Sequence, residues 1–104
     1  LNAIGWYCGN AGSTTHPVAQ KIPNNWGLYD MSGNVFEWCE DWYGTYPAGP
    51  VSDPAGPSTG DDRVFRGGGW DESARYARPA FRIGYTPDIP SSNLGFRLVL
   101  PPGQ

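Results

Sequence analysis

The sequence predicts an irregular α+β fold with few short strands and little helix. Its 104 residues include 15 glycines and 11 prolines, and both residue types interrupt helices. The chain also carries 5 tryptophans, 6 tyrosines and 4 phenylalanines, with few leucines and isoleucines beside them. We therefore expect loops held together by large aromatic side chains. A chain of this length provides one domain with a small core.

The charged residues divide the chain into an acidic part and a basic part. Residues 1–62 carry seven acidic residues and one lysine, whereas residues 63–104 carry three acidic residues and six arginines. Since arginine binds carboxylates with two hydrogen bonds, we expect the parts to pair, or alternatively to form an anion-binding pocket. The net charge of −3 and the near absence of lysine argue against nucleic-acid binding. No run approaches the roughly 20 apolar residues that span a bilayer, so no membrane partner is expected.

A tight turn is predicted at residues 30–34. Residues 13–27 before it are polar and rich in turn residues, which predicts a surface loop. Within the turn, Gly33 is expected to take a positive φ, because glycine has no Cβ that would clash in this conformation.

Three short strands are predicted after this turn. The first covers residues 35–43, where aromatic residues alternate with polar ones, and the others cover residues 63–66 and 94–100. Residues 44–62 are rich in proline and glycine and predict a long loop. Loops of this length within a domain are usually functional or mobile.

The two cysteines, Cys8 and Cys39, permit one disulfide at most. Two free thiols are equally compatible with the sequence. The redox compartment of the protein therefore stays open.

Four segments, in this order along the chain, resemble one known family. They are NWGLYDMSGNVFEW at residues 25–38, DWY at 41–43, RVFRGGGW at 63–70 and NLGFR at 93–97. Together they resemble the formylglycine-generating, sulfatase-modifying family, whose fold is a variant of the C-type lectin fold. The resemblance implies that residues 1–104 form the C-terminal part of one sulfatase-modifying-factor-type domain. A missing N-terminal half or a second chain would complete that domain.

The resemblance also implies a calcium site at the predicted turn. The family binds calcium at the positions that match Asp30, Gly33, Val35 and Glu37 in this sequence. Calcium prefers several hard oxygens, which carboxylates and backbone carbonyls both supply. In the alternative interpretation, Asp30 caps the turn and Glu37 pairs with an arginine. The resemblance thus implies Ca²⁺ as the cofactor of this chain.

The family's oxidation chemistry is not expected in this chain. Active members oxidise a substrate cysteine with two of their own cysteines, spaced five apart, which hold copper. Glu72 and Ala77 occupy the matching positions here. Because Cu(I) prefers thiolate ligands, neither residue replaces them, and we expect no copper and no catalytic residue.

A small ligand is expected along residues 70–75. The resemblance extends to relatives such as the ergothioneine-type sulfoxide synthases, in which this segment helps to form the substrate cleft. Asp71 and Arg75 would then bind a zwitterionic ligand through charge pairing, next to Trp70. In the alternative interpretation, Trp70 belongs to the core and Arg75 forms a structural ion pair.

Residues 71–92 also resemble the variable proteins of diversity-generating retroelements, some of which use this lectin-like scaffold. Regular positions alternate there with irregular ones, whose codons lie one or two base changes from asparagine codons. In that interpretation Tyr76, Phe81, Tyr85 and Ile89 form a display surface with aromatic anchors, as in antibody paratopes. Ordinary packing of the loop is the alternative.

The sequence thus favours a non-catalytic, calcium-binding, lectin-like module that binds a protein or a small molecule. One alternative is a variable display protein. Another is the substrate-binding part of a formylglycine-generating or sulfoxide-synthase-type oxidase. The residues expected to contact a ligand are Trp70, Asp71, Glu72, Arg75, Tyr76, Phe81 and Tyr85.

Overall fold

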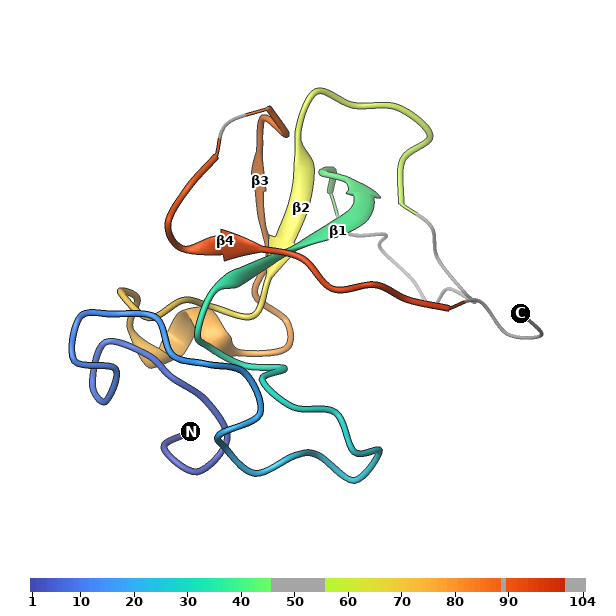
Figure 1. The fold of residues 1–104 in the computed structure, drawn as a ribbon. Helices are drawn as coiled ribbons and strands as arrows, with labels where there is room; N and C mark the ends of the chain where they lie inside the picture. The colour runs from blue at the N-terminus through green and yellow to red at the C-terminus, as the bar shows by residue number, and fades with distance from the viewer. Residues whose placement is uncertain (46–55, 89, 101–104) are drawn as a thin grey trace.

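A four-stranded sheet organises the chain in the computed structural model, which describes residues 1–45, 56–88 and 90–100 (Figure 1). The strands lie in the order β3-β2-β1-β4. The elements are β1 (Phe36–Trp42), β2 (Arg63–Arg66), the 3₁₀ helix η1 (Ala74–Ala77), β3 (Ile83–Tyr85) and β4 (Leu94–Gly95). The predicted architecture of few short strands and little helix is confirmed.

β1 and β2 form the centre of the sheet because aromatic side chains on the two strands interlock. The strands pair antiparallel, with Trp38 opposite Phe65. The ring of Phe65 packs edge-to-face against Phe36 and Trp38, at centroid distances of 5.0 and 5.5 Å. Both strands lie where the sequence predicted them, and β1 is shorter than predicted by one residue at each end.

The two outer strands differ from the prediction. β3 was not predicted, because three residues with a central glycine show no strand-like alternation, and it forms by antiparallel pairing with β2. β4 pairs parallel with β1, with Leu94 beside Phe36, but it ends at Gly95. The predicted strand over 94–100 is therefore wrong beyond Gly95. Residues 96–100 continue past the edge of the sheet and take no part in its ladders.

Residues 1–35 contain no helix or strand, and hydrogen bonds fasten them to the rest of the chain. At the predicted turn, the Gly33 N–H donates to the Gly67 carbonyl at 2.5 Å and the Asn34 N–H donates to the Trp6 carbonyl at 2.7 Å. Gly33 has a φ of 85°, as predicted. A Cβ at this position would lie 2.3 Å from the Trp6 carbonyl oxygen. The turn therefore requires glycine both for its conformation and for space.

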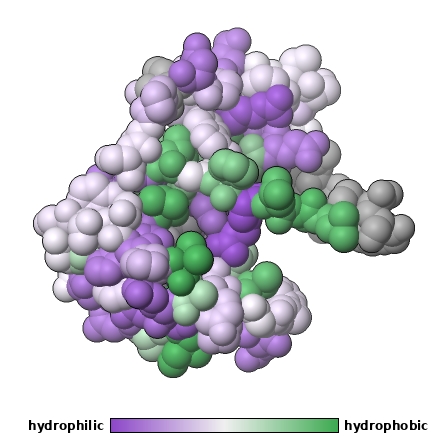
Figure 2. All heavy atoms as spheres, viewed as in Figure 1, coloured by the Kyte–Doolittle hydropathy of each residue, from purple (hydrophilic) through white to green (hydrophobic). Residues whose placement is uncertain are grey.

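The apolar core is small, as expected for this length. Its buried side chains are Ala11, Phe36, Val64 and Ala77. Large apolar side chains lie at the surface instead, including Trp26 at 87% exposure and Leu98 at 90%. Figure 2 shows a row of apolar side chains along the projecting C-terminal segment.

The predicted loops agree with the structure where they can be compared. Residues 13–27 form neither helix nor strand and are mostly exposed, as predicted. Most of the long loop predicted at 44–62 falls on residues 46–55, which lie outside the described residues. In the described parts of the chain, no helix has the length and apolar character needed to cross a membrane.

Candidate functional site

An aromatic pocket of about 450 Å³ lies where β2, β3, η1 and the segment before β4 meet. The described residues that line it are Phe36, Phe65, Glu72, Tyr76, Phe81, Ile83, Tyr85, Pro90, Ser91, Asn93 and Leu94. Four of them, Glu72, Tyr76, Phe81 and Tyr85, are residues that the sequence predicted to contact a ligand. We call this cavity the aromatic pocket below.

The rings of the aromatic pocket stand nearly at right angles to one another. Tyr76 and Phe81 pack edge-to-face at 4.8 Å with an interplanar angle of 86°, and Phe65 and Tyr85 do so at 6.3 Å and 73°. Short turns bring these rings together. The N–H of Tyr76 donates to the carbonyl of Ser73 at the start of η1, and the N–H of Phe81 donates to the carbonyl three residues before it. The pocket is therefore assembled from side chains on short turns and strands.

Three predicted ligand residues lie outside the lining of the pocket. The Trp70 indole N–H donates to the Ser92 carbonyl at 3.3 Å, so Trp70 braces the loop before β4. The Asp71 carboxylate accepts from the Asn93 side chain at 3.3 and 3.4 Å. The Arg75 guanidinium is fully exposed and donates to the Tyr76 hydroxyl at 2.7 Å, a hydrogen bond that raises the pKa of Arg75. Asp71 and Arg75 thus contact residues that line the pocket, Asn93 and Tyr76, and Trp70 contacts the segment between Ser91 and Asn93.

The positions that match the family's cysteine pair carry no sulfur. Glu72 lines the aromatic pocket, and Ala77 is buried at the end of η1. Cys8 lies near Glu72, because its backbone N–H donates to the Glu72 carbonyl at 2.9 Å. Neither cysteine is among the described residues that line the pocket, and both are free thiols.

The Cys39 thiol lies on β1 and faces a different cavity. Burial raises the pKa of this thiol, an effect that nearby Arg66 opposes and the carboxylates of Asp41 and Glu37 reinforce. A raised pKa keeps the sulfur in its protonated, weakly nucleophilic form near neutral pH. The environment of Cys39 is therefore the opposite of the one that activates a catalytic cysteine.

Asp30 is the buried carboxylate of the turn. It is 9% exposed, and it takes a positive φ of 56°. Its Oδ2 accepts from the Ala19 N–H at 2.8 Å, whereas its Oδ1 is buried without a hydrogen-bond partner. A buried carboxylate oxygen without a partner is costly, and a cation would satisfy it.

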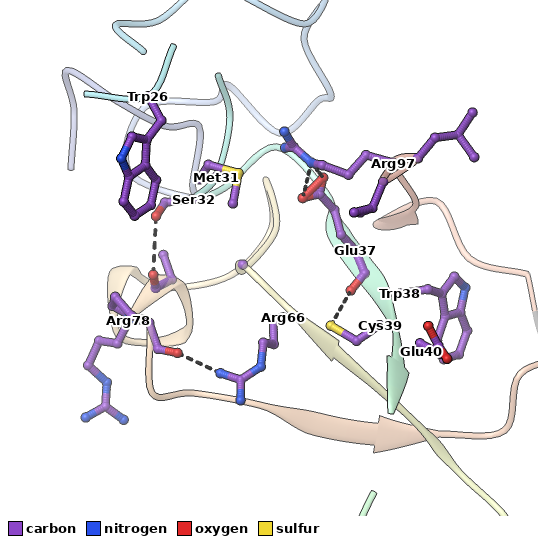
Figure 3. A pocket seen from close by; sticks show the side chains of 15 residues that line it. Trp26, Met31, Ser32, Glu37, Trp38, Cys39, Glu40, Arg66, Arg78 and Arg97 are labelled. Carbon is purple, nitrogen blue, oxygen red and sulfur yellow. Dashed lines mark hydrogen bonds and ion pairs between the residues drawn. The ribbon is translucent and has the colours of Figure 1, made fainter. Parts of the chain in front are cut away.

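Arg97 joins Asp30 to Glu37. Its Nε donates to both carboxylate oxygens of Glu37, at 2.8 and 3.0 Å (Figure 3). Its other two nitrogens donate to the carbonyls of Tyr29 and Asp30, each at 3.0 Å. The pairing of Glu37 with an arginine, expected as the alternative to calcium, is therefore present.

One of these contacts favours the calcium ion that the family resemblance implies, and another disfavours it. The free Oδ1 of Asp30 fits a hard cation, whereas the charge of Glu37 is already balanced by Arg97. Each carboxylate oxygen of Glu37 keeps a further lone pair, so its capacity as a ligand is not exhausted. No group of three or more acidic, histidine or cysteine side chains suited to a metal exists in the described part of the chain. A calcium ion here would depend on the backbone carbonyls of Gly33 and Val35 as well.

Sequence reasoning missed several residues of these two sites. Phe65 and Ile83 line the aromatic pocket, and Arg97 was counted only among the C-terminal arginines. The alternation of the RVFR segment, which puts Phe65 and Val64 on opposite faces, was the available signal for Phe65. Ile83 belongs to the irregular positions of residues 71–92 but was not among the expected ligand residues, because its place in the pocket depends on the pairing of β3 with β2.

The family described as "Sulfatase-modifying factor enzyme 1-like domain" matches residues 4–101. The formylglycine-generating enzyme of Streptomyces coelicolor is 46% identical over an alignment of 89 residues, and the match covers 81% of this chain and 28% of that enzyme. The chain therefore spans less than a third of the length of this relative.

Two solved structures share the fold. Treponema denticola variable protein 1 matches with a TM-score of 0.86 and 44% identity, over 91% of this chain and 35% of that one. PvdO from Pseudomonas aeruginosa matches with a TM-score of 0.80 and 28% identity, over 92% of this chain and 38% of that one. The expected irregular, lectin-like α+β fold is confirmed.

Proposed function

This chain belongs to the sulfatase-modifying factor enzyme 1-like domain family, and we propose that it is a non-catalytic module that binds its ligand in the aromatic pocket. The observation that carries this proposal is the convergence of Glu72, Tyr76, Phe81 and Tyr85 on one cavity. The volume of about 450 Å³ lies within the range of small-ligand sites, roughly 300–1,000 Å³, and also accommodates a protein side chain.

The absence of a thiol from the family's catalytic positions supports binding rather than oxidation. Glu72 offers a carboxylate and Ala77 a methyl group, and neither holds Cu(I) or forms a disulfide with a substrate cysteine. The free cysteines do not replace them, since Cys39 faces another cavity and Cys8 lies outside the pocket lining.

Two measurements test this proposal. A sulfatase-type cysteine peptide, incubated with the chain and copper, should remain unconverted by mass spectrometry. Peptides selected from a displayed random library should bind the wild-type chain and lose at least about tenfold in affinity for Tyr85→Ser or Phe81→Ser. Tyr29→Ser, at an exposed tyrosine that lines neither cavity, is the matched control and should bind as wild type. Conversion of the peptide, or equal binding by all variants, would contradict the proposal.

A variable display protein is the second candidate function. The observation in its favour is the 44% identity to Treponema denticola variable protein 1 over 91% of this chain. Tyr76, Phe81 and Tyr85, expected as display residues, all line the aromatic pocket, and Ile89 lies outside the described residues. Sequencing the neighbouring genome decides this candidate. A near-identical, asparagine-rich template repeat of the segment supports it, and the absence of such a repeat rejects it.

Calcium binding at the turn is proposed as a structural role. The unpartnered Oδ1 of Asp30 supports it, and Arg97 is expected to compete for the carboxylate of Glu37. Bound calcium would tie residues 30–37 together and stabilise the folded chain by mass action.

The test is calorimetric titration with Ca²⁺ on metal-free protein. Asp30→Asn should weaken binding at least about tenfold, whereas Arg97→Met should strengthen it by freeing Glu37. Glu40→Gln, a change at an exposed carboxylate outside the turn, is the control. No heat of binding in either wild type or Arg97→Met would reject the calcium proposal.

A second cavity of the chain is the one that Cys39 lines, and we propose that it binds a polypeptide that completes the domain. This cleft of about 860 Å³ is lined by exposed apolar side chains that include Trp26, Met31, Leu98 and Val99, together with Trp38 (Figure 3). The chain covers only 35% of Treponema denticola variable protein 1, so most of that protein has no counterpart here. Its remaining part, on the same polypeptide or on a second one, would shield these side chains from water.

A chimera tests this partner. The matching 35% of Treponema denticola variable protein 1 is replaced by this chain, and amide hydrogen exchange is followed by mass spectrometry. Residues 96–100 should exchange at least about 100-fold more slowly in the chimera than in the isolated chain. The amide of Val18, an exposed apolar residue away from the cleft, is the internal control. Equal exchange at 96–100 in both, or a chimera that does not fold, would contradict the proposal.

A further inference from the structure

Glu72 contributes a carboxyl group to the lining of the aromatic pocket. Among the eleven described residues that line the cavity, it is the acid, and none is a lysine, arginine or histidine. Its side chain is partly buried against aromatic and aliphatic neighbours. The exposed Arg75, which lies outside the lining, interacts electrostatically with Glu72, but solvent screens a fully exposed charge. A carboxylate in a largely aromatic pocket, whose basic neighbour lies outside the lining, favours a ligand that brings a positive charge.

The rings of the pocket favour the same kind of ligand. An aromatic face carries the negative part of the ring quadrupole, and cations bind within about 6 Å of the ring centre. Because Tyr76 and Phe81 meet at 86° and Phe65 and Tyr85 at 73°, the rings line the cavity from more than one direction. A rounded cation with apolar substituents matches walls of this kind better than a flat or anionic molecule.

One ring of the pocket already attracts a cation of the chain itself. The Arg75 guanidinium stands 4.8 Å from the Tyr76 ring centre. Arg75 is fully exposed and does not line the cavity. The Glu72 carboxylate and the rings of Phe81 and Tyr85 therefore line a cavity to which the described residues contribute no basic side chain.

We propose that the aromatic pocket binds an organic cation of the alkylammonium class, with Glu72 balancing its charge and Tyr76, Phe81 and Tyr85 contacting its apolar substituents. This inference rests on the proposed binding function and specifies its ligand. The cation is either a free small molecule or a methylated lysine side chain of a protein. Both carry the same trimethylammonium group, so the experiment distinguishes the two sources.

The test compares choline with 3,3-dimethylbutan-1-ol, which has the same shape without the charge. Chemical-shift titration of the 104-residue chain should show choline binding at least about tenfold more tightly, as a desolvated cation–π contact and an ion partner imply. Glu72→Gln should remove most of this preference and leave the alcohol unaffected. Tyr85→Leu should weaken choline binding, and Tyr29→Leu, at an exposed tyrosine that lines neither cavity, should not. A trimethyllysine peptide that binds more tightly than choline identifies a protein side chain as the source, and a weaker one identifies a free small molecule.

The outcomes separate this inference from the broader proposal. Equal binding of choline and the alcohol at the pocket would overturn the charge preference and leave the binding function intact. Binding of selected peptides without any response to choline or trimethyllysine would do the same. Because the two probes are compared on the unaltered protein, the result does not depend on whether a variant folds. Choline binding that is unchanged in both Glu72→Gln and Tyr85→Leu would place the cation elsewhere and overturn the inference.

Discussion

The turn at residues 30–34 and the aromatic pocket are both irregular in structure, but different kinds of contact stabilise them. In the turn, backbone groups bind one another directly, as in the Gly33 contact with Gly67, and Asp30, Gly33 and Asn34 all have positive φ values. In the pocket, contacts run mainly between ring edges and faces, and its rings other than Phe36 are only partly buried or exposed. Contacts in the turn therefore determine the conformation of the backbone, whereas contacts in the pocket determine how side chains are arranged on the backbone.

This difference teaches which residues are free to change. A side chain whose main role is to present a ring can be replaced without moving the chain. A residue whose φ angle or missing Cβ is required cannot be replaced. Ligand specificity is therefore expected to vary among proteins with this fold while the turn stays constant in shape.

The largest effect should come from breaking the turn. Gly33→Ala needs a φ of 85° and would bring its Cβ within 2.3 Å of the Trp6 carbonyl oxygen, so we expect a loss of about 3 kcal/mol or more. Gly27→Ala has a similar φ of 77° but no atom within 4 Å, and it should cost about 1 kcal/mol. Urea unfolding followed by tryptophan fluorescence measures both. Equal losses would mean that the close contact does not matter.

The next effect contrasts a buried ring with a displayed ring. Phe36 is 4% exposed and contacts Phe65, so Phe36→Ala should lower the free energy of unfolding by about 3 kcal/mol. Tyr85 lines the aromatic pocket but is 46% exposed, and Tyr85→Ser should cost below about 1 kcal/mol. Thermal unfolding of the two variants checks the contrast. Phe36 also lines the aromatic pocket, so the two variants compare its buried ring with an exposed one. A Tyr85→Ser loss as large as that of Phe36→Ala would show that the exposed rings of the pocket also stabilise the fold.

A smaller loss of stability is expected when the ion pair between Arg97 and Glu37 is removed. Arg97→Met removes the pair with Glu37 and the hydrogen bonds to the Tyr29 and Asp30 carbonyls. Because both charged side chains remain partly exposed, we expect about 1–2 kcal/mol, less at high salt. Urea unfolding at low and high ionic strength measures this loss. Arg78→Met, an exposed arginine that caps the end of η1, should change stability by about 0.5 kcal/mol or less.

The smallest effect concerns the two thiols. Cys39 is half-buried and burial raises its pKa, whereas Cys8 is exposed, so iodoacetamide should modify Cys8 first at pH 7.5. The pKa of Cys39 is higher in the folded chain than in the unfolded chain, where it is about 8.5. The contribution of this difference to the free energy of unfolding is therefore fully present below the unfolded pKa and is lost as the pH rises through the folded pKa. Unfolding free energies above pH 8.5 should therefore fall more steeply for wild type than for Cys39→Ser. A slower modification of Cys8 than of Cys39 would contradict the assigned environments.

The turn could largely be predicted from the sequence, whereas the outer strands of the sheet mostly could not. Gly33 was predicted at positive φ because turn chemistry depends on a few neighbouring residues, and this was confirmed. The central strands were predicted because aromatic alternation is also local. β3 and the early end of β4 could not be predicted, since both depend on whether a neighbouring strand is present. Pairing is a property of the folded chain and not of a local pattern.

The candidate site was predicted in residue type more than in geometry. Tyr76, Phe81 and Tyr85 were expected to contact a ligand, and the structure places them around one cavity. The arginines were expected to pair with acids or to bind an anion. Arg97 pairs with Glu37, whereas Arg75 instead stacks on a tyrosine ring. Sequence shows that a charge is present, but its partner depends on contacts between distant segments.

The pairing of β1 with β4 has a kinetic consequence. Phe36 and Leu94 stand side by side in parallel strands, with more than half of the chain between them. Contacts so distant in sequence form late, because the entropy of closing the loop is lost before the contact is gained. Until β4 docks, one edge of β1 stays open to another molecule, which favours association of partly folded chains. The yield of refolded monomer should therefore fall as the protein concentration during refolding rises.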